Sequence, residues 1–114
     1  MEQPIGMKEP GKKSWVCYMK KTLYGLMQAV WAWKLRLHCA MLEICYIRIS
    51  ADHCIYMHDS PTGKSIVAIH VDDMCVAASN KTEMAKLKEQ LGKLFSLVDL
   101  GKLRWLLGIA ITRD

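Results

Sequence analysis

Two apolar runs separated by only two acidic residues constrain the fold of this chain most strongly. Residues 66–71 read Ile-Val-Ala-Ile-His-Val, and residues 74–78 read Met-Cys-Val-Ala-Ala. Each run has the length and apolar character of a buried strand. Only Asp72 and Asp73 lie between them, and a connection this short joins antiparallel neighbours. The sequence therefore predicts a β-hairpin that carries a pair of carboxylates.

Two segments have the periodicity of helices. From Leu26 to about Cys45, apolar residues recur every three or four positions, which predicts a helix with one buried face. Asn80 followed by Glu83 resembles a helix start, and an apolar stripe continues from it. We expect the buried stripes to be Val30, Trp33, Leu37, Met41 and Ile44 in the first helix, and Met84, Leu87, Leu91, Leu94 and Phe95 in the second.

Shorter apolar runs predict further strands. Residues 15–19 and 54–57 read as short strands, residues 58–63 carry turn chemistry, and residues 106–111 predict a strand pair or one bent strand. At 114 residues the chain is expected to form one domain. We therefore predict an α+β domain over residues 1–114, in which an antiparallel sheet with a central hairpin is covered by two helices on one face.

Charge and cysteine usage limit the classes of partner and compartment. Residues 1–50 hold eight Lys or Arg against three Glu, whereas the remainder of the chain is balanced, so the N-terminal half is expected to attract polyanions. The five cysteines form no Cys-x-x-Cys pair, which favours an intracellular, reducing compartment over a secreted disulfide scaffold. Neither a signal peptide nor an apolar run of about 18–20 residues is visible, so no membrane partner is expected.

The adjacent Asp72 and Asp73 support two interpretations. Carboxylates forced together beside apolar strands repel each other unless a cation neutralises them, and Mg²⁺ is commonly held by one or two carboxylates together with substrate phosphates. Aspartate is also among the commonest turn residues, so a solvated and inert hairpin tip is the alternative.

Basic residues around two aromatic side chains also have two interpretations. Lys12-Lys13 and Lys20-Lys21 bracket Trp15 and Tyr18. Lysines that contact phosphates beside aromatics that stack on bases are typical of nucleic-acid binding. The alternative is a solvated strand end whose aromatic side chains lie in the core.

Six landmarks along the chain resemble those of the reverse transcriptase in copia-type LTR retrotransposon Pol polyproteins. They are Met1-Glu2-Gln3-Pro4, Leu23-Tyr24-Gly25-Leu26 with Gln28-Ala29 and Trp33, Ser50-Ala51-Asp52-His53-Cys54-Ile55-Tyr56, Val71-Asp72-Asp73-Met74, Asp99-Leu100-Gly101, and Leu107-Gly108. Their order and spacing match the family from the first residue to the last.

The resemblance implies roles for particular residues. Asp72 and Asp73 would be catalytic, Mg²⁺-binding aspartates of the palm hairpin. Tyr24, Gly25 and Gln28 would lie beside the incoming nucleotide and template. The implied partners are an RNA or DNA template-primer, with Lys12, Lys13, Lys20 and Lys21 among the contacts, and the remaining segments of the Pol polyprotein.

The chain also departs from the family pattern. The family's third metal-binding aspartate lies upstream of the first landmark, His70 stands where tyrosine is usual, and Met27 replaces a usual lysine. We therefore expect a palm fragment that descends from an enzyme performing two-metal nucleotidyl transfer and is inactive as an isolated chain. The alternatives are a non-catalytic nucleic-acid-binding or interaction module, and a poorly folding relic.

Overall fold

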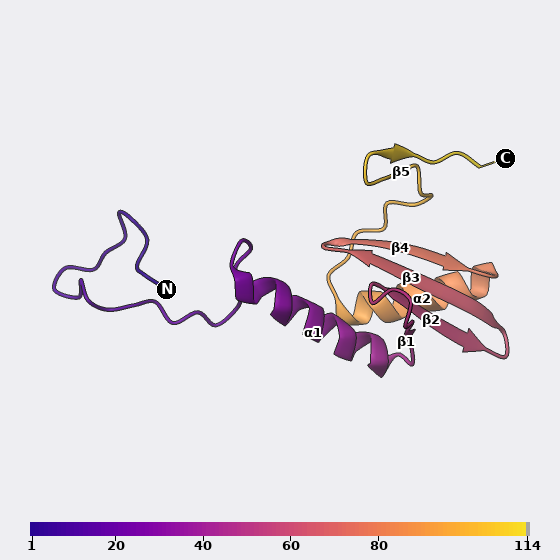
Figure 1. Cartoon of the computed structure of the whole chain (residues 1–114), viewed down its shortest axis with the longest axis horizontal. Helices are drawn as coiled ribbons and strands as arrows, with labels where there is room; N and C mark the ends of the chain where they lie inside the picture. The colour runs from indigo at the N-terminus through magenta and orange to yellow at the C-terminus, as the bar shows by residue number, and fades with distance from the viewer. Residues whose placement is uncertain (114) are drawn as a thin grey trace. The chain divides into compact units, whose positions relative to one another are not determined.

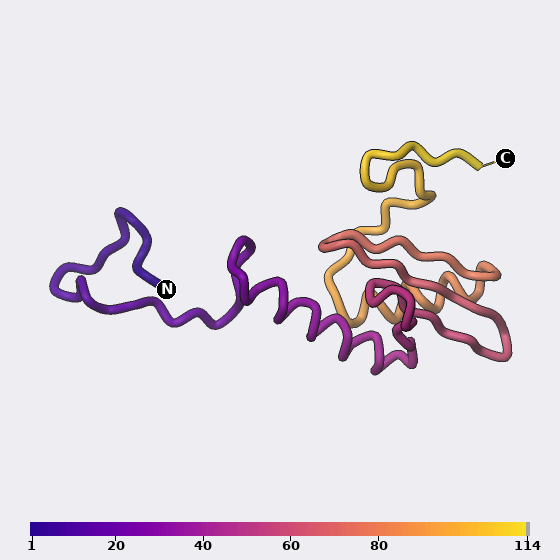
Figure 2. The backbone as a smooth tube through the Cα atoms, viewed as in Figure 1, coloured from indigo at the N-terminus to yellow at the C-terminus, as the bar shows by residue number. Residues whose placement is uncertain are grey.

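The computed structural model describes residues 1–113 as two compact units. The first unit is Met1–Leu37 and the second begins at His38, so the boundary falls within helix α1, Met27–Glu43. Figure 1 shows the elements, and Figure 2 traces the backbone, which forms no helix or strand before α1.

The strand predicted over residues 15–19 is wrong. Only one isolated bridge forms there, between Glu2 and Val16. The amide of Gln3 organises this segment as a loop instead: its Nε2 donates to the carbonyls of Lys12 and Trp15, at 2.7 Å each, and its Oε1 accepts from the N–H of Glu9 at 3.1 Å. A strand needs a neighbouring strand to satisfy its backbone, and here one side chain takes over part of that role.

The first predicted helix is confirmed as α1. Leu37 and Met41 of the predicted stripe are buried, and so is Ala40, which the stripe did not include, whereas Val30 is 57% exposed. The helix ends at a left-handed residue, Cys45, with φ of 64°. The N–H of Tyr46 reaches back to the carbonyl of Met41 at 2.9 Å, which is the longer hydrogen bond of a Schellman motif.

Four antiparallel strands form the main sheet in the order β1-β2-β3-β4. Their bounds are β1 Ile47–Arg48, β2 Ile55–Ser60, β3 Gly63–His70 and β4 Asp73–Ala78. The predicted hairpin is therefore confirmed as β3–β4. The expected turn over residues 58–63 is wrong in extent, because residues 58–60 continue β2 in register with β3. His58 explains this extension, since its Nδ1 bonds to the Cys45 carbonyl at 3.0 Å and its ring stacks on Tyr46.

One face of this sheet forms the core. Ser65, Val67 and Ile69 of β3 are buried on it, and Tyr56 lies opposite Val67 in the register. Helix α2, Lys81–Leu94, contacts β3 and β4 with its buried residues Leu87 and Leu91. The Nδ1 of His38 in α1 bonds to the Tyr56 hydroxyl at 3.1 Å, so the part of α1 that belongs to the second unit reaches the same face. The predicted α+β fold, with two helices on one face of an antiparallel sheet, is confirmed.

Two buried hydroxyl groups form a hydrogen-bonded pair within this core. The hydroxyl of Tyr46, a residue 2% exposed, is hydrogen-bonded to the Ser65 hydroxyl. Burial raises the pKa of Tyr46 above its ordinary value. A neutral phenol that is both buried and hydrogen-bonded satisfies the requirement for polar groups in a core.

Helix α2 starts as the sequence predicts. Asn80 is the N-cap, and its side chain accepts from the N–H of Glu83 at 2.8 Å. The same side chain donates to the carbonyl of Thr62 at 2.9 Å, and Glu83 accepts a hydrogen bond from the Thr62 hydroxyl. The start of α2 is thereby attached to the turn between β2 and β3.

Strands β5, Trp105–Leu106, and β6, Ile109–Ala110, form a small hairpin after α2. This pair confirms the strand pair predicted for this segment. Leu107 and Gly108 between them both have positive φ, 51° and 79°, as a two-residue type I′ turn requires. Upstream, Asp99 accepts from the Gly101 N–H at 2.9 Å and pairs with Lys88 of α2 at 2.7 Å. Within residues 1–113, neither helix is long and apolar enough to cross a membrane.

Candidate functional site

The two predicted metal-binding residues lie at the β3–β4 turn, but the turn is offset by one residue from the prediction. His70 pairs with Asp73, so Val71 and Asp72 form the turn and Asp73 begins β4. Val71 has a φ of 52° and Asp72 does not share the positive φ, which is the pattern of a type II′ turn. Glycine is usual at that first position, so the β-branched Val71 is strained there.

This turn sets the positions of both carboxylates. Asp72 and Asp73 are consecutive and exposed, one within the turn and one at the first position of a strand. Side chains alternate between faces along a strand, so Asp73 shares the outer face of the sheet with Cys75, opposite the helices. His70 is the cross-strand partner of Asp73 and lies on that face as well.

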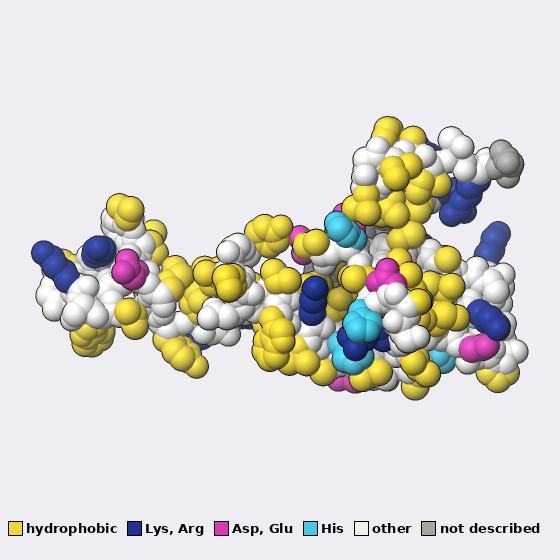
Figure 3. All heavy atoms as spheres, in the orientation of Figure 1, with side chains coloured by type: hydrophobic (Ala, Val, Ile, Leu, Met, Phe, Trp, Pro, Cys, Tyr) yellow, Lys and Arg dark blue, Asp and Glu magenta, His cyan; other side chains and the backbone are white. Residues whose placement is uncertain are grey.

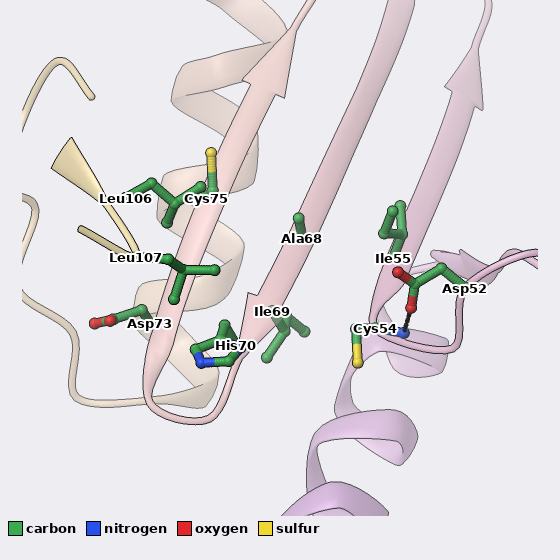
Figure 4. A pocket seen from close by; sticks show the side chains of 10 residues that line it. All are labelled: Asp52, Cys54, Ile55, Ala68, Ile69, His70, Asp73, Cys75, Leu106 and Leu107. Carbon is green, nitrogen blue, oxygen red and sulfur yellow. Dashed lines mark hydrogen bonds between the residues drawn. The ribbon is translucent and has the colours of Figure 1, made fainter. Parts of the chain in front are cut away.

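A pocket of about 250 Å³ opens on the outer face next to the acidic turn. Its walls come from the ends of β2, β3 and β4 and from the C-terminal hairpin, as Figure 4 shows. The residues that line it are Asp52, Cys54, Ile55, Ala68, Ile69, His70, Asp73, Cys75, Leu106 and Leu107. In Figure 4 the carboxylate of Asp73 is directed away from β3, and Leu106 and Leu107 lie beside β4.

The carboxylate oxygens of Asp72 and Asp73 are suitable ligands for one hard cation that is also coordinated by water or phosphate oxygens. Among residues 1–113, no three His, Cys, Asp or Glu side chains are grouped as a metal centre. The other acid of the pocket, Asp52, already accepts from the Cys54 N–H at 2.8 Å. Mg²⁺ keeps several waters and is commonly bound through one or two carboxylates plus substrate phosphates. Asp72 and Asp73 can supply the two carboxylates of such a site.

The residues expected beside the nucleotide and template share one turn in the N-terminal unit. Tyr24 is 87% exposed, Gly25 has a φ of 91°, and Gln28 is exposed as the second residue of α1. A left-handed φ at Gly25 lets the chain reverse just before the helix. The aromatic ring of Tyr24 and the amide of Gln28 are therefore both exposed to solvent, four residues apart in the sequence.

The four lysines expected to contact nucleic acid also belong to the N-terminal unit. Lys12 Nζ lies 4.7 Å from the centroid of the Trp15 ring and 3.1 Å from the Glu9 carboxylate. Lys13, Lys20 and Lys21 are exposed. Trp15 and Tyr18 are 63% and 91% exposed, so the alternative that placed these aromatics in the core is wrong. Figure 3 shows lysine and apolar side chains together on the surface of this unit.

Several residues of the pocket were not grouped with the acidic turn on sequence grounds, although Asp52, Cys54 and Leu107 lie within family landmarks. Asp52 and Cys54 precede β2, whereas Leu106 and Leu107 belong to the C-terminal hairpin. They meet the acidic turn only through the topology of the sheet. No local spacing in the sequence could have grouped them.

The α+β sheet carries two adjacent carboxylates where β3 turns into β4, and comparison with known sequences identifies the family of this chain. The family model described as reverse transcriptase (RNA-dependent DNA polymerase) matches residues 1–114. The chain therefore belongs to the reverse transcriptase family. The predicted resemblance to the reverse transcriptase of transposon Pol polyproteins is confirmed.

Curated relatives are proteins of transposons. The chain is 38% identical to the retrovirus-related Pol polyprotein from transposon TNT 1-94 of Nicotiana tabacum, over all of this chain and 9% of that protein. It is 31% identical to a putative transposon Ty5-1 protein of Saccharomyces cerevisiae, over 97% of this chain and 38% of that protein. Identity to the Pol polyprotein from transposon RE1 of Arabidopsis thaliana is 32%, over 99% of this chain and 8% of that protein. The chain thus spans well under half of each relative, and no solved structure matches it.

Proposed function

We propose that this chain is the part of a copia-type retrotransposon reverse transcriptase palm that carries two of its metal-binding carboxylates. The observation that carries this proposal is the β3–β4 turn. It holds Asp72 and Asp73 exposed at the end of a six-pair antiparallel ladder. A rigid ladder that ends in two adjacent carboxylates is suited to present oxygen ligands in a fixed geometry.

Asp72 and Asp73 would hold Mg²⁺ in this site. When bound, the ion supplies charge stabilisation to a phosphoryl group undergoing in-line displacement. The chain's own contribution is to position the ligands. The strained Val71 and the His70–Asp73 pair fix the backbone positions of Asp72 and Asp73. Two-metal nucleotidyl transfer also needs carboxylates that converge from separate strands, so this chain on its own does not extend a primer.

Primer extension tests this function. The full chain is incubated with a labelled primer on an RNA or DNA template, deoxynucleotides, and Mg²⁺ or Mn²⁺. We expect no template-dependent product from this chain alone. Synthesis that disappears in Asp72→Asn but persists in Asp59→Asn, an exposed acid of β2, would show that the two carboxylates suffice and would overturn the incomplete-site proposal.

The basic N-terminal unit favours a second function, which is binding of nucleic acid without catalysis. Exposed Trp15 and Tyr18 stand among Lys12, Lys13, Lys20 and Lys21. Such a surface combines phosphate contacts with base stacking.

Binding of single-stranded nucleic acid should then weaken steeply as salt rises and should not change in Asp72→Asn. Replacing Lys20 and Lys21 by Gln should weaken it, whereas the same change at Lys64 and Lys93, which pair with acids, serves as the control. Binding that ignores salt would contradict this function.

The five cysteines are free. We place the chain in an intracellular, reducing compartment, where such thiols persist. Thiol labelling of the protein taken directly from cells should modify all five cysteines, and recovery of a native disulfide would contradict this placement.

A further inference from the structure

The segment between α2 and the β5–β6 hairpin contains Asp99-Leu100-Gly101, one of the six family landmarks. The Asp99 carboxylate makes two bonds there. Lys88 Nζ of α2 donates to one oxygen at 2.7 Å, and the Gly101 N–H donates to the other at 2.9 Å. The first bond joins the segment to α2, and the second closes an Asx turn. Gly101 has a φ of 77°, a left-handed conformation that costs glycine little.

Apolar burial does not hold the segment at this point. The neighbours of Asp99, Val98 and Leu100, are 84% and 89% exposed. The bonds from Lys88 and Gly101 both favour the charged carboxylate, and they hold the pKa of Asp99 below its ordinary value. A hydrogen bond between an ammonium and a carboxylate is stronger than one between neutral groups. The polar bonds of Asp99 are therefore what attaches residues 98–100 to the rest of the unit.

This attachment lies close to the hairpin along the chain. Strand β5 begins at Trp105, and the base of the hairpin is closed by the bond from the Ile111 N–H to the Arg104 carbonyl at 2.8 Å. The four residue steps from Gly101 to Trp105 span at most about 14 Å. Fixing Asp99 against α2 therefore limits how far the hairpin can move from the sheet.

The hairpin supplies one wall of the pocket beside the acidic turn. Leu106 of β5 and Leu107 of the hairpin turn line this pocket together with Asp73 and Cys75 of β4 (Figure 4). An apolar wall keeps water from one side of the pocket. The lower local dielectric constant then strengthens the attraction of a nearby carboxylate for a cation.

We propose that Asp99 is a positioning residue that, through Lys88, holds the β5–β6 hairpin beside β4, so that the apolar wall borders the carboxylate of Asp73. This inference deepens the proposed function and rests on it, because the wall acts on a carboxylate that binds the metal ion. The placement of the hairpin itself does not require the ion, so the two can be tested separately.

Cross-linking between thiols measures where the hairpin lies. In the full chain carrying Leu107→Cys, the new thiol is on the hairpin and Cys75 lines the same pocket. A short bismaleimide should join residues 75 and 107, and peptide mapping over time gives the rate. Adding Asp99→Asn keeps the acceptor of the Asx turn but removes the charge, so the rate should fall by up to about fivefold, the limit for an exposed ion pair. Asp99→Ala loses both bonds and should lower the rate further.

Glu89 and Lys93 provide the matched control, because they form an exposed ion pair at 2.8 Å within α2 itself. Glu89→Gln should lower the urea midpoint about as much as Asp99→Asn, yet leave the cross-linking rate unchanged. Lys88→Met should reproduce the effect of Asp99→Asn, and Lys93→Met should not. This comparison separates positioning of the hairpin from a general loss of stability.

NMR spectra of the chain without the added thiol give a second measurement. The amide signals of residues 105–110 should shift in Asp99→Ala and stay in place in Glu89→Gln. If they do so but Mn²⁺ leaves the signals of the acidic turn unchanged, the proposed function fails and the positioning of the hairpin by Asp99 stands. An unchanged cross-linking rate in Asp99→Ala, an equal fall in Glu89→Gln, or no link between residues 75 and 107 in the parent variant would overturn the proposal.

Discussion

Glu83, on the first turn of α2, accepts a hydrogen bond from the hydroxyl of Thr62 in the β2–β3 turn. Only 4% of Glu83 is exposed, and Lys86 lies 3.2 Å from its carboxylate. Asn80 adds a second connection to the Thr62 carbonyl. This contact attaches the helix to the far end of the sheet from the acidic turn, and the stability of the unit should depend on it.

Acid should loosen this attachment. The hydrogen bond from Thr62, aided by Lys86, holds the pKa of Glu83 below its ordinary value of 4.5. A lowered folded-state pKa contributes stability that is present above the unfolded-state value and is lost as pH falls through the folded-state value. The urea midpoint should therefore drop between about pH 5 and about pH 3. In Glu83→Gln the drop should be smaller, though not absent, because Glu89 and Asp99 also have lowered pKa values, owing to Lys93 and Lys88. An unchanged drop would contradict the role of Glu83.

Gly63 allows the close approach of this helix start. A Cβ at that position would lie 2.4 Å from Ser79 Oγ and 2.7 Å from Asn80 Nδ2. Gly63→Ala should therefore destabilise the protein by about 1–3 kcal/mol through overpacking. Gly92→Ala is the matched control, because it lies in α2 with no atom near the new Cβ and should stabilise by about 0.8–1 kcal/mol. Urea unfolding of both variants measures the difference, and equal effects would contradict the tight fit at Gly63.

Truncating the core under the sheet should be costly. Leu87 is 1% exposed and packs from α2 toward β3 and β4. Leu87→Ala should lower the unfolding free energy by about 2–5 kcal/mol. Leu100→Ala, at a residue 89% exposed, should change it by less than about 0.5 kcal/mol. A small loss at Leu87 would show that α2 does not form part of the cooperative core.

The turn that carries the acids should be strained at Val71. Its φ of 52° is a conformation that costs an L-residue roughly 1–2 kcal/mol and glycine little. Val71→Gly should therefore leave stability unchanged or raise it by up to about 1 kcal/mol, since glycine also loses more entropy on folding. Val67→Gly, in the same ladder with ordinary φ and full burial, should destabilise strongly. A marked loss of stability in Val71→Gly would contradict the strain.

Local patterns predicted the elements whose signals are contained within one segment. The α1 periodicity, the Asn80–Glu83 helix start and the two runs of the β3–β4 hairpin all act over a few residues, and the structure has each of them. The hairpin turn was misplaced by one residue because Asp73 was expected in the turn, whereas its pairing with His70 makes it part of β4.

Features that depend on distant partners were not predictable in this way. The run at residues 15–19 is apolar enough for a strand, but Gln3 satisfies part of its backbone and no neighbouring strand forms. The pocket beside the acids likewise joins Asp52 and Leu106, which only the topology brings together. The spacing of residues within one segment carries no information about contacts between residues that are far apart in the sequence.

Paramagnetic broadening by Mn²⁺ tests most directly whether the acidic turn binds a divalent ion. In NMR spectra of the full chain, low concentrations of Mn²⁺ should broaden the amide signals of residues 70–74 first. Asp72→Asn combined with Asp73→Asn should remove this broadening, and Asp59→Asn, at an exposed acid elsewhere on the sheet, should leave it intact. Broadening that begins at Asp59 or spreads evenly over the exposed acids, with no change in the double variant, would contradict a metal-binding role for Asp72 and Asp73.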